Sequence, residues 1–425
     1  MERLDVEGEF WTAENPSRRV SGTLTFDEKT GGRLSLIGSF DSFPPASRSS
    51  ESGNYRRIFG HAESGPYTLE DSFQTRWLMG SHGGREVLRV GKIIKGAELT
   101  STGQFAVGHL SVRLDGLVYW ANRSGIQDRS AGHSPAFTVE SLPSERIDTA
   151  WGRLELGQTW SQTGDHRAEV RVTQDFVFSL VFDQLTPFKD AVEIASDLQD
   201  LVSIATDSTA GFRQVSFRHP ELFQLVDDDP IPISGEVFVQ WIARSCEDSR
   251  TSRRRMLFTI DDLGGMPGVQ RWLETAQKHR SALGRVMAMR YLPSAFSEDR
   301  AGNRFMALEG FHKDRSAGPG QFTYVKRLLA LANLAGDPFV RLVGDVDAWC
   351  KRIRSARNDI AHHNGRRLYE QEGNLYYLGE SAYFLFVICM LRDSGAPEVV
   401  FEKIEKSGVY GWLRSELAAT IPRQT

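Results

Sequence analysis

The residues with the clearest capacity for chemistry lie in one short stretch, RNDIAHHNG at residues 357–365. Arg357 precedes His362 by five residues, and Asn358 stands between them. A guanidinium can stabilise negative charge on a phosphate through its planar fork, and an imidazole can exchange a proton near neutral pH. Such a pair suits catalysis at a phosphodiester, with Asn358 orienting the imidazole. The same spacing occurs by chance in many helices, so a catalytic pair and an ordinary polar helix face are both open interpretations.

Apolar residues around this stretch predict the helix that carries it. They recur at steps of four and three residues, which makes one stripe against a core. The members of this stripe are Leu342, Val346, Trp349, Ile353, Ala356 and Ile360. His363 is the next member and can pair with Asp359 four residues earlier. Asn358 and His362 instead face outward, and Arg357 lies at the flank between the two faces.

The end of this helix predicts a proton-transfer position for His362. Asn364 and Gly365 favour a left-handed C-terminal cap. His362 then lies in the last turn, where unpaired carbonyls and the negative end of the helix dipole favour an imidazolium. Arg357 and His362 are about 140 degrees apart around a straight helix, so one chain does not bring both to one phosphate. A cleft shared by two copies would, and the spacing therefore predicts a dimer if it predicts an enzyme.

Positive charge gathers around the pair, although the 425-residue chain has a net charge of -4. The overall charge argues against a protein that coats nucleic acid through its general field. A local patch of basic residues against the single acid Asp359 could still accommodate a phosphodiester. The basic residues are Lys351, Arg352, Arg354, Arg357, Arg366 and Arg367.

Other signatures of phosphate or metal chemistry are missing from the sequence. It has no P-loop, no dinucleotide-binding glycine fingerprint and no H-E-x-x-H zinc motif. Residues 80–86 predict a β-turn, and the arginine-rich residues 250–255 predict a solvated loop more than an RNA contact. Cys246, Cys350 and Cys389 lie far apart without a C-x-x-C, so neither a disulfide framework nor a thiolate zinc site is expected. We therefore expect no metal and no cofactor.

The start of the chain and its apolar runs bear on its compartment. Residues 2–11 have neither the basic start nor the apolar stretch of a secretory signal, so we expect a cytoplasmic protein. With 40% hydrophobic and 25% charged residues, the composition is that of a soluble globular protein. The longest apolar run, residues 382–391, is about half the length of a membrane span and predicts a buried core helix. We expect no membrane partner.

Hydrophobic periodicity divides the chain near residue 265 into a β-rich front half and an all-α back half. Strands are predicted at residues 19–26, 32–40, 55–62, 86–94, 151–157, 168–174, 176–182, 212–217 and 235–241. Helices are predicted at residues 187–207, 269–291, 297–312, 322–335, 339–363, 381–393 and 398–406. We expect an α+β multidomain chain, with a β-sandwich-like domain at residues 1–135, an α+β middle region at 136–265 and an all-α helical bundle at 266–425.

Several stretches resemble a known family. RNDIAHH, at residues 357–363, resembles the R-x(4–6)-H motif of HEPN domains. Residues 256–314 look like the entry to the HEPN domain of ApeA-type abortive-infection proteins. Residues 8–40, 55–73 and 109–126 resemble the N-terminal domain of the same proteins. The resemblance covers almost the full chain, with the HEPN motif intact.

This resemblance implies a metal-independent endoribonuclease of anti-phage defence that cuts tRNA or other structured RNA. His362 would act as general base or acid at the ribose 2'-OH, Arg357 would stabilise the transition state, and Asn358 would orient. The implied RNA contacts are Lys351, Arg354, Arg366 and Arg367. His363, Asp359 and Glu309 are expected to support the pair without contacting RNA. Glu309 and His312 lie on one predicted helix that can pack beside the motif helix, and a surface ion pair or a helix cap explains these two residues equally well.

The implied partners are RNA, a second copy of the chain and a phage-encoded activator. As a hypothesis, the N-terminal half senses a phage product or restrains the nuclease, because an RNase that is always active would harm its host. The competing interpretation is a non-catalytic sensor or binding module that dimerises through a HEPN-like helical domain and recruits another component. RNA cleavage that depends on Arg357 and His362 would separate the two.

Overall fold

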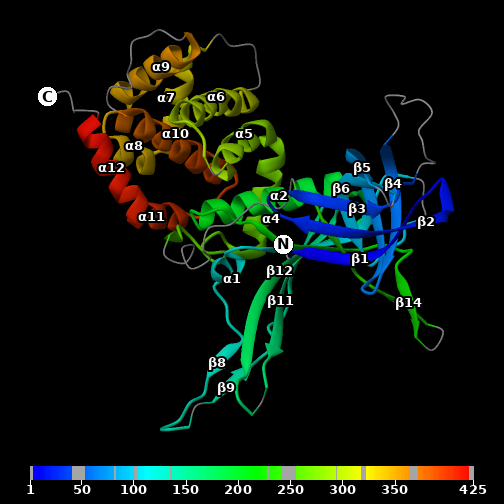
Figure 1. Ribbon diagram of the computed structural model, residues 1–425. Coiled ribbons are helices and arrows are strands. Elements are labelled where there is room, and N and C mark those ends of the chain that lie inside the picture. The colour runs from blue at the N-terminus through cyan, green and yellow to red at the C-terminus, as the bar shows by residue number, and fades with distance from the viewer. Residues whose placement is uncertain are drawn as a thin grey trace. The chain divides into compact units, whose positions relative to one another are not determined.

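Residues that are neighbours in space group into two units that interleave along the chain (Figure 1). The first unit comprises Met1–Leu117, Gly125–Ala195 and Gly211–Cys246, and the second comprises Val118–Ser124, Ser196–Ala210 and Glu247–Thr425. This computed structural model describes residues 3–40, 53–80, 83–99, 103–134, 136–165, 167–226, 229–240, 255–292, 294–316, 322–362 and 372–420. The three-part division at residues 135 and 265 stays a prediction.

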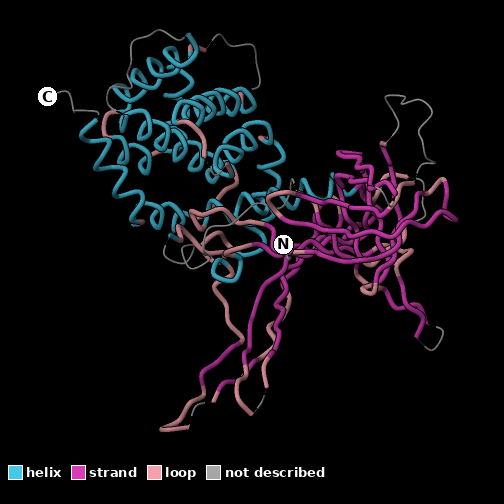
Figure 2. Tube along the Cα trace, viewed as in Figure 1, coloured by secondary structure: helices cyan, strands magenta, loops and turns pink. Residues whose placement is uncertain are grey.

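The β-rich N-terminal half is confirmed, and its first six strands form a barrel-like sheet. These strands are β1 (Leu4–Thr12), β2 (Asn15–Asp27), β3 (Gly31–Ile37), β4 (Asn54–Ala62), β5 (Gly65–Gly80) and β6 (Gly83–Lys95). They pair in the order β6-β3-β2-β1-β4-β5, and a further pairing of β5 with β6 closes the set. Figure 2 shows the strands in magenta and the helices in cyan. Alternating apolar residues predict which face of each strand is buried, but they do not predict which strands pair at the edges of the sheet. The sequence predicted a sandwich-like sheet, and the structure instead has a sheet that curls so that β5 and β6 pair.

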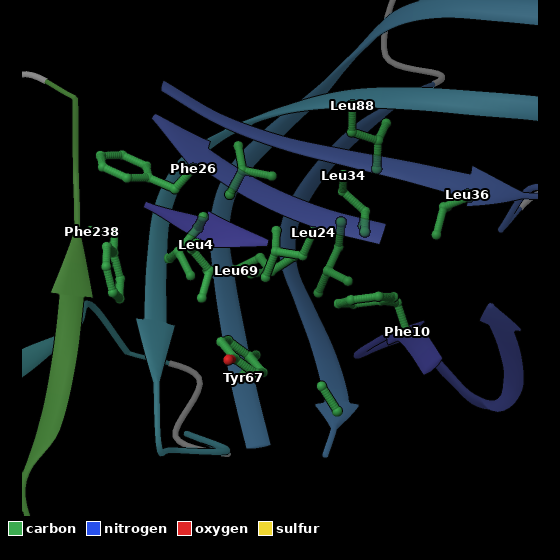
Figure 3. Packing of buried hydrophobic residues seen from close by; sticks show 14 of the residues in the cluster. Leu4, Phe10, Leu24, Phe26, Leu34, Leu36, Tyr67, Leu69, Leu88 and Phe238 are labelled. Atoms are coloured by element: carbon green, nitrogen blue, oxygen red, sulfur yellow. The ribbon is translucent and has the colours of Figure 1, made fainter. Parts of the chain in front are cut away.

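Apolar side chains from these strands pack together as one core (Figure 3). Leu24, Leu34, Leu69 and Leu88 are fully buried, each on a different strand. Phe238 joins the same core and is 8% exposed. Burying one such side chain contributes roughly 1.5–3 kcal/mol, so this cluster is the main source of stability for the barrel.

From β6 the sheet continues through six more strands, in the order β16-β13-β7-β12-β11-β10. These are β16 (Gly235–Phe238), β13 (Phe212–Arg218), β7 (Ala106–Leu114), β12 (Arg171–Pro187), β11 (Gly152–Thr163) and β10 (Glu145–Thr149). Two short ribbons pair separately, β8 (Ile126–Asp128) with β9 (Phe137–Val139) and β14 (Phe223–Val226) with β15 (Asp229–Pro232).

One correction concerns β12, which the sequence predicts as two strands at residues 168–174 and 176–182. The structure joins them into a single strand, with Asp175 in the ladder opposite Thr159. The carboxylate of Asp175 is paired with the guanidinium of Arg213. A charged residue therefore stays within the strand, because its charge is compensated from the neighbouring part of the sheet.

Helices make up the second unit. They are α1 (Leu117–Trp120), the end of α2 (Phe188–Ala205), α4 (Gly265–Lys278), α5 (Arg280–Tyr291), α6 (Ser297–Arg315), α7 (Tyr324–Ala335), α8 (Asp337–Val343), α9 (Val346–His362), α10 (Glu372–Asp393), α11 (Glu398–Lys406) and α12 (Gly408–Thr420). The helical back half is confirmed. Helix α12 was not expected, because Gly408 and Gly411 within it are poor helix formers.

Two predicted helices are each broken into two. The helix expected at residues 269–291 ends and restarts at His279, whose backbone leaves helical geometry (φ -110, ψ 21). The side chain of His279 is fully buried, and its Nε2 lies 2.8 Å from Oδ2 of Asp393. The helix expected at residues 339–363 is interrupted at Gly344, which has a φ of 75 degrees. Periodicity runs through both breaks, so the pattern alone does not reveal them.

Helix α10 is the centre of the helical unit and packs against α6, α7, α8 and α12 (Figure 1). Its segment Asn374–Asp393 is long and apolar enough to cross a membrane by length and composition alone. Of its most apolar window, however, 78% is buried inside the protein. The prediction of a buried core helix at residues 382–391 is therefore confirmed.

Candidate functional site

Helix α9 carries the predicted pair and is fixed against the core by its apolar face. Its first turn is capped by Asp345, whose Oδ1 accepts a hydrogen bond from the Ala348 amide over 2.8 Å. Trp349 is fully buried, and its indole Nε1 donates to Ser381 Oγ of α10 over 2.8 Å. Ile353 and Ala356 continue the buried face. The apolar stripe predicted for this helix is confirmed from Trp349 to Ala356, and it fixes which side of α9 faces outward.

Arg357 is the most tightly held of the predicted site residues. Its side chain is 33% exposed, and its Nη2 donates to Oε2 of Glu309 on α6 over 2.9 Å. Its guanidinium carbon lies 4.7 Å from the ring centroid of Tyr324 on α7. Within the described part of the chain, its buried Nε has no hydrogen-bond partner. Two neighbouring helices therefore set the plane and position of the guanidinium.

Glu309 is an ionised partner for this arginine. Lys313, one helical turn later, lies 2.8 Å from Oε1 of Glu309. The hydrogen bond from Lys313 holds the pKa of Glu309 below its ordinary value, and the positive charges of Arg357 and Arg327 add to that effect. These interactions outweigh partial burial, which acts in the opposite direction. Glu309 thus contacts the motif helix through Arg357, and its supporting role at the site stays a prediction.

The aromatic ring of Tyr324 packs against the guanidinium of Arg357. Its hydroxyl donates to the backbone carbonyl of Phe305 over 2.9 Å, which fixes the ring on α6. Burial raises the pKa of this phenol, so Tyr324 stays neutral at physiological pH. A neutral ring face attracts the guanidinium through its quadrupole. Sequence reasoning missed Tyr324, because the contact depends on how α7 packs and leaves no local pattern.

His362 lies at the other end of the predicted motif, as the last residue of α9. Its side chain is exposed, as the helical wheel predicts, whereas Asn358 and Asp359 are half-buried. Among the described residues, none of these three side chains is hydrogen-bonded to another. Arg357 and His362 stand on one continuous helix, about 7.5 Å apart along its axis.

The remaining predicted positions fall into two groups. Lys351 and Arg354 are exposed on α9, and Arg352 is half-buried. His363, Arg366 and Arg367 lie outside the described residues. The predicted positive patch therefore has Lys351, Arg352, Arg354 and the flanking Arg357 as its described members on α9.

His312 serves a different purpose from Glu309, its neighbour on α6. His312 is 6% exposed, and its Nδ1 lies 3.1 Å from Nη1 of Arg327, which donates to it, and 3.1 Å from Oγ of Ser316. Burial lowers the pKa of His312, and the charges of Arg327 and Arg315 lower it further. A neutral, buried imidazole here is a packing and hydrogen-bonding element that joins α6 to α7.

Comparison with known protein families defines the class. The helical unit matches the model described as Apea-like HEPN over residues 303–399, which include Glu309, Tyr324, Arg357 and His362. Residues 5–272, more than half of the chain, match the model of ApeA N-terminal domain 1. Among curated proteins and among solved structures, nothing matches the chain.

The chain belongs to the ApeA family, with the ApeA N-terminal domain 1 followed by an Apea-like HEPN domain. The family is one of defence-related HEPN nucleases. The resemblance found in the sequence is thereby confirmed, and its N-terminal part extends across the whole first unit into α4.

Proposed function

We propose that this protein is an anti-phage endoribonuclease that cleaves host RNA, such as tRNA, in a dimer of its HEPN domains. The observation that carries the proposal is the arrangement around Arg357. A guanidinium fixed by Glu309 and Tyr324 stands on the same helix as the exposed His362, within the matched HEPN region. A fixed cation and an accessible imidazole are the two groups that metal-independent RNA cleavage requires.

In the proposed reaction the RNA supplies its own nucleophile. The ribose 2'-oxygen attacks the adjacent phosphorus, the bond to the 5'-oxygen breaks, and the products carry a 2',3'-cyclic phosphate and a 5'-hydroxyl. His362 takes the proton from the 2'-OH or gives one to the departing 5'-oxygen. Arg357 stabilises the negative charge that grows on the phosphoryl oxygens. Asn358 orients the imidazole, and Lys351 and Arg354 bind neighbouring phosphates.

A twofold arrangement completes this site. On one helix Arg357 and His362 point in directions about 140 degrees apart. Two copies of α9 facing each other would place the arginine of one chain near the histidine of the other. The other two predicted RNA contacts, Arg366 and Arg367, would bind further phosphates.

The Glu309 carboxylate has a specific place in this mechanism. It binds Nη2 of Arg357, and among the described residues Nη1 has no hydrogen-bond partner and could bind a phosphate. Pre-positioning the guanidinium removes the entropy cost of ordering a long side chain at the moment of reaction. Glu309 also offsets part of the positive charge of Arg357, which weakens binding of the RNA ground state. The transition state carries more negative charge on its phosphoryl oxygens, so Arg357 stabilises it more strongly than it stabilises the ground state.

The direct test is incubation of the purified full chain with total RNA in excess chelator. Cleavage that leaves 2',3'-cyclic phosphate ends and stops in both Arg357→Ala and His362→Ala supports the proposal. Arg414→Ala serves as a matched control, since Arg414 is an exposed arginine of the same unit on α12. RNA that stays intact even with an extract of phage-infected cells would instead favour the non-catalytic sensor that dimerises through its HEPN domain.

The ends of the RNA and the position of the cut carry further information. A 3'-phosphate without a cyclic form, or cleavage that continues in His362→Ala, would contradict the assigned role of the histidine. Replacing His363 should lower stability more than it lowers cleavage. Loss of cleavage in a normally folded His363→Ala variant would reverse the assignment of the two histidines.

A further inference from the structure

One face of the first unit's sheet carries a row of polar side chains across adjacent strands. Ser111 of β7 pairs with Ser216 of β13, Ser216 pairs with Glu236 of β16, and Glu236 pairs with Lys95 of β6. Paired residues in an antiparallel ladder point to the same face, so these four side chains form one line. The line crosses the sheet where it leaves the barrel.

The opposite face of the same strands is apolar and closed. Its side chains are at most 1% exposed, and they are Leu110, Val112, Leu114, Val215, Phe217 and Val237. A sheet with one buried face needs no polar residues on the other face beyond what solubility requires. What distinguishes this polar face is its shape, because it is hollowed.

Two cavities adjoin here, with volumes of about 510 and 520 Å³. The first lies on this polar face, and the second is also lined by Val215 and Val237. Both are lined by Arg113 of β7, Gln214 of β13 and Glu236 of β16, so they meet along these three side chains. Cavities of this size are typical of sites for small molecules. Most residues that line the first cavity are polar, so a ligand there would be held mainly by hydrogen bonds and charge.

Among the described residues that line the two cavities, Arg113 is the one cation that forms no ion pair. Nζ of Lys95 lies 3.7 Å from Oε2 of Glu236, and Gln214 donates to the other oxygen of the same carboxylate. Arg213 is paired with Asp175. Arg113 is half-buried and has neither an ion pair nor a hydrogen bond from its side chain within the described residues. A guanidinium in a concave site that forms no ion pair with the neighbouring carboxylates is suited to an anionic ligand.

Neutral hydroxyl groups surround this cation. The hydroxyl side chains that line the first cavity are Ser64, Ser111, Thr159, Ser216 and Ser234. Ser111 is hydrogen-bonded to Nε2 of His109 and to Oγ of Ser179, each over 3.0 Å. Burial lowers the pKa of His109, with Arg218 adding to the effect, so the imidazole is neutral and can serve as donor or acceptor. The cavity therefore offers both kinds of hydrogen-bonding group.

We propose that these two cavities form a binding site for a small hydroxylated molecule with one phosphate group, with Arg113 binding the phosphate. The serine and threonine hydroxyls and the Glu236 carboxylate then bind the hydroxyls of the ligand. A nucleoside monophosphate and a sugar phosphate share this chemistry. The site lies wholly in the first unit, and it does not depend on RNA cleavage by the second.

The test is isothermal titration calorimetry on the full chain with three probes: AMP, ribose 5-phosphate and inorganic phosphate. We expect saturable binding of ribose 5-phosphate, of AMP, or of both, tighter than that of inorganic phosphate. Arg113→Ala should weaken binding about ten- to a hundredfold, because a charge-assisted contact is lost. Binding of AMP alone identifies the nucleotide as the ligand source, and equal binding of both identifies the sugar phosphate they share.

Two further variants make the result decisive. Arg113→Lys keeps the charge but loses the fork, so it should also weaken binding even if Arg113→Ala does not fold. Arg33→Ala replaces an exposed arginine of β3 outside the cavities and should bind like the parent. Absence of saturable binding for all three probes overturns the proposal. So does equal affinity in the parent and the Arg113 variants, or binding of both AMP and ribose 5-phosphate no tighter than that of inorganic phosphate.

Discussion

Glu309 of α6 accepts a hydrogen bond from Arg357 of α9 over 2.9 Å, although 48 residues separate them in the sequence. Lys313 binds the other oxygen of the same carboxylate, and the ring of Tyr324 lies beneath the guanidinium. The arginine of the HEPN motif is therefore placed by three helices. Substitutions of Arg357, Glu309 and Tyr324 should therefore differ in their effects on RNA cleavage, RNA binding and stability.

Replacing Arg357 by lysine should abolish most RNA cleavage although the positive charge remains. Lysine cannot keep the bond to Glu309, the contact with Tyr324 and a phosphate contact at once, because it has no planar fork. We expect a loss of about 100-fold or more in cleavage rate, measured on one defined RNA substrate. Arg414→Lys is the matched control. A rate within about threefold of the parent would mean that charge alone suffices at this position.

Glu309→Gln should lower the cleavage rate while RNA binding is kept or strengthened. Glutamine can still accept a hydrogen bond from Arg357, but the net positive charge of the site rises. We therefore expect a decrease in kcat, together with a KM that is unchanged or lower. Steady-state kinetics over a range of RNA concentrations measures both. An unchanged kcat would show that Glu309 only supports the packing of α6 against α9.

The two parts of Tyr324 should contribute differently. Tyr324→Phe loses the hydrogen bond to the Phe305 carbonyl, at a cost of about 1 kcal/mol in stability, but keeps the ring under Arg357. Tyr324→Leu also removes the ring face, so cleavage should fall much further than stability does. Chemical unfolding and cleavage assays on both variants check this. Equal cleavage by the two variants would contradict a positioning role for the ring.

His312 should make the protein less stable in mildly acidic solution. Its folded-state pKa lies below the ordinary value of 6.5, so the folded state favours the neutral imidazole. The resulting stabilisation is complete above pH 6.5 and is lost as the pH falls through the lower, folded-state pKa. The denaturant midpoint should therefore fall between pH 7.5 and pH 5.5 more in the parent than in His312→Gln. Parallel pH profiles for the two proteins would exclude this origin.

Asp393 should be a strong determinant of the stability of the helical unit. Its carboxylate is 12% exposed and binds the fully buried His279 together with Arg315. Asp393→Ala would leave both partners without their acceptor, at a cost of about 2–3 kcal/mol. Asp337→Ala is the control, because Asp337 is 82% exposed and its pair with Arg341 should contribute less than about 0.5 kcal/mol. Similar unfolding midpoints for the two variants would contradict this assignment.

The sequence by itself determined the types of element and the identity of the motif. The alternating pattern in the front half and the spacing of Trp349, Ile353 and Ala356 depend only on local geometry, so they were readable without a structure. The same spacing predicted that His362 faces outward. The resemblance of residues 8–40 and 357–363 to a known family then gave the class of protein. Such motifs are contiguous in the sequence, so they can be recognised without a structure.

Only the tertiary structure decided where helices break and what holds the arginine. Periodicity continues through His279 and Gly344, where the breaks coincide with a buried hydrogen bond between His279 and Asp393 and with a glycine of positive φ. Tyr324 meets Arg357, and Arg113 faces its cavities, through contacts between elements that are far apart in sequence. Contacts of this kind depend on how whole helices and strands pack together, and no local spacing of residues encodes them.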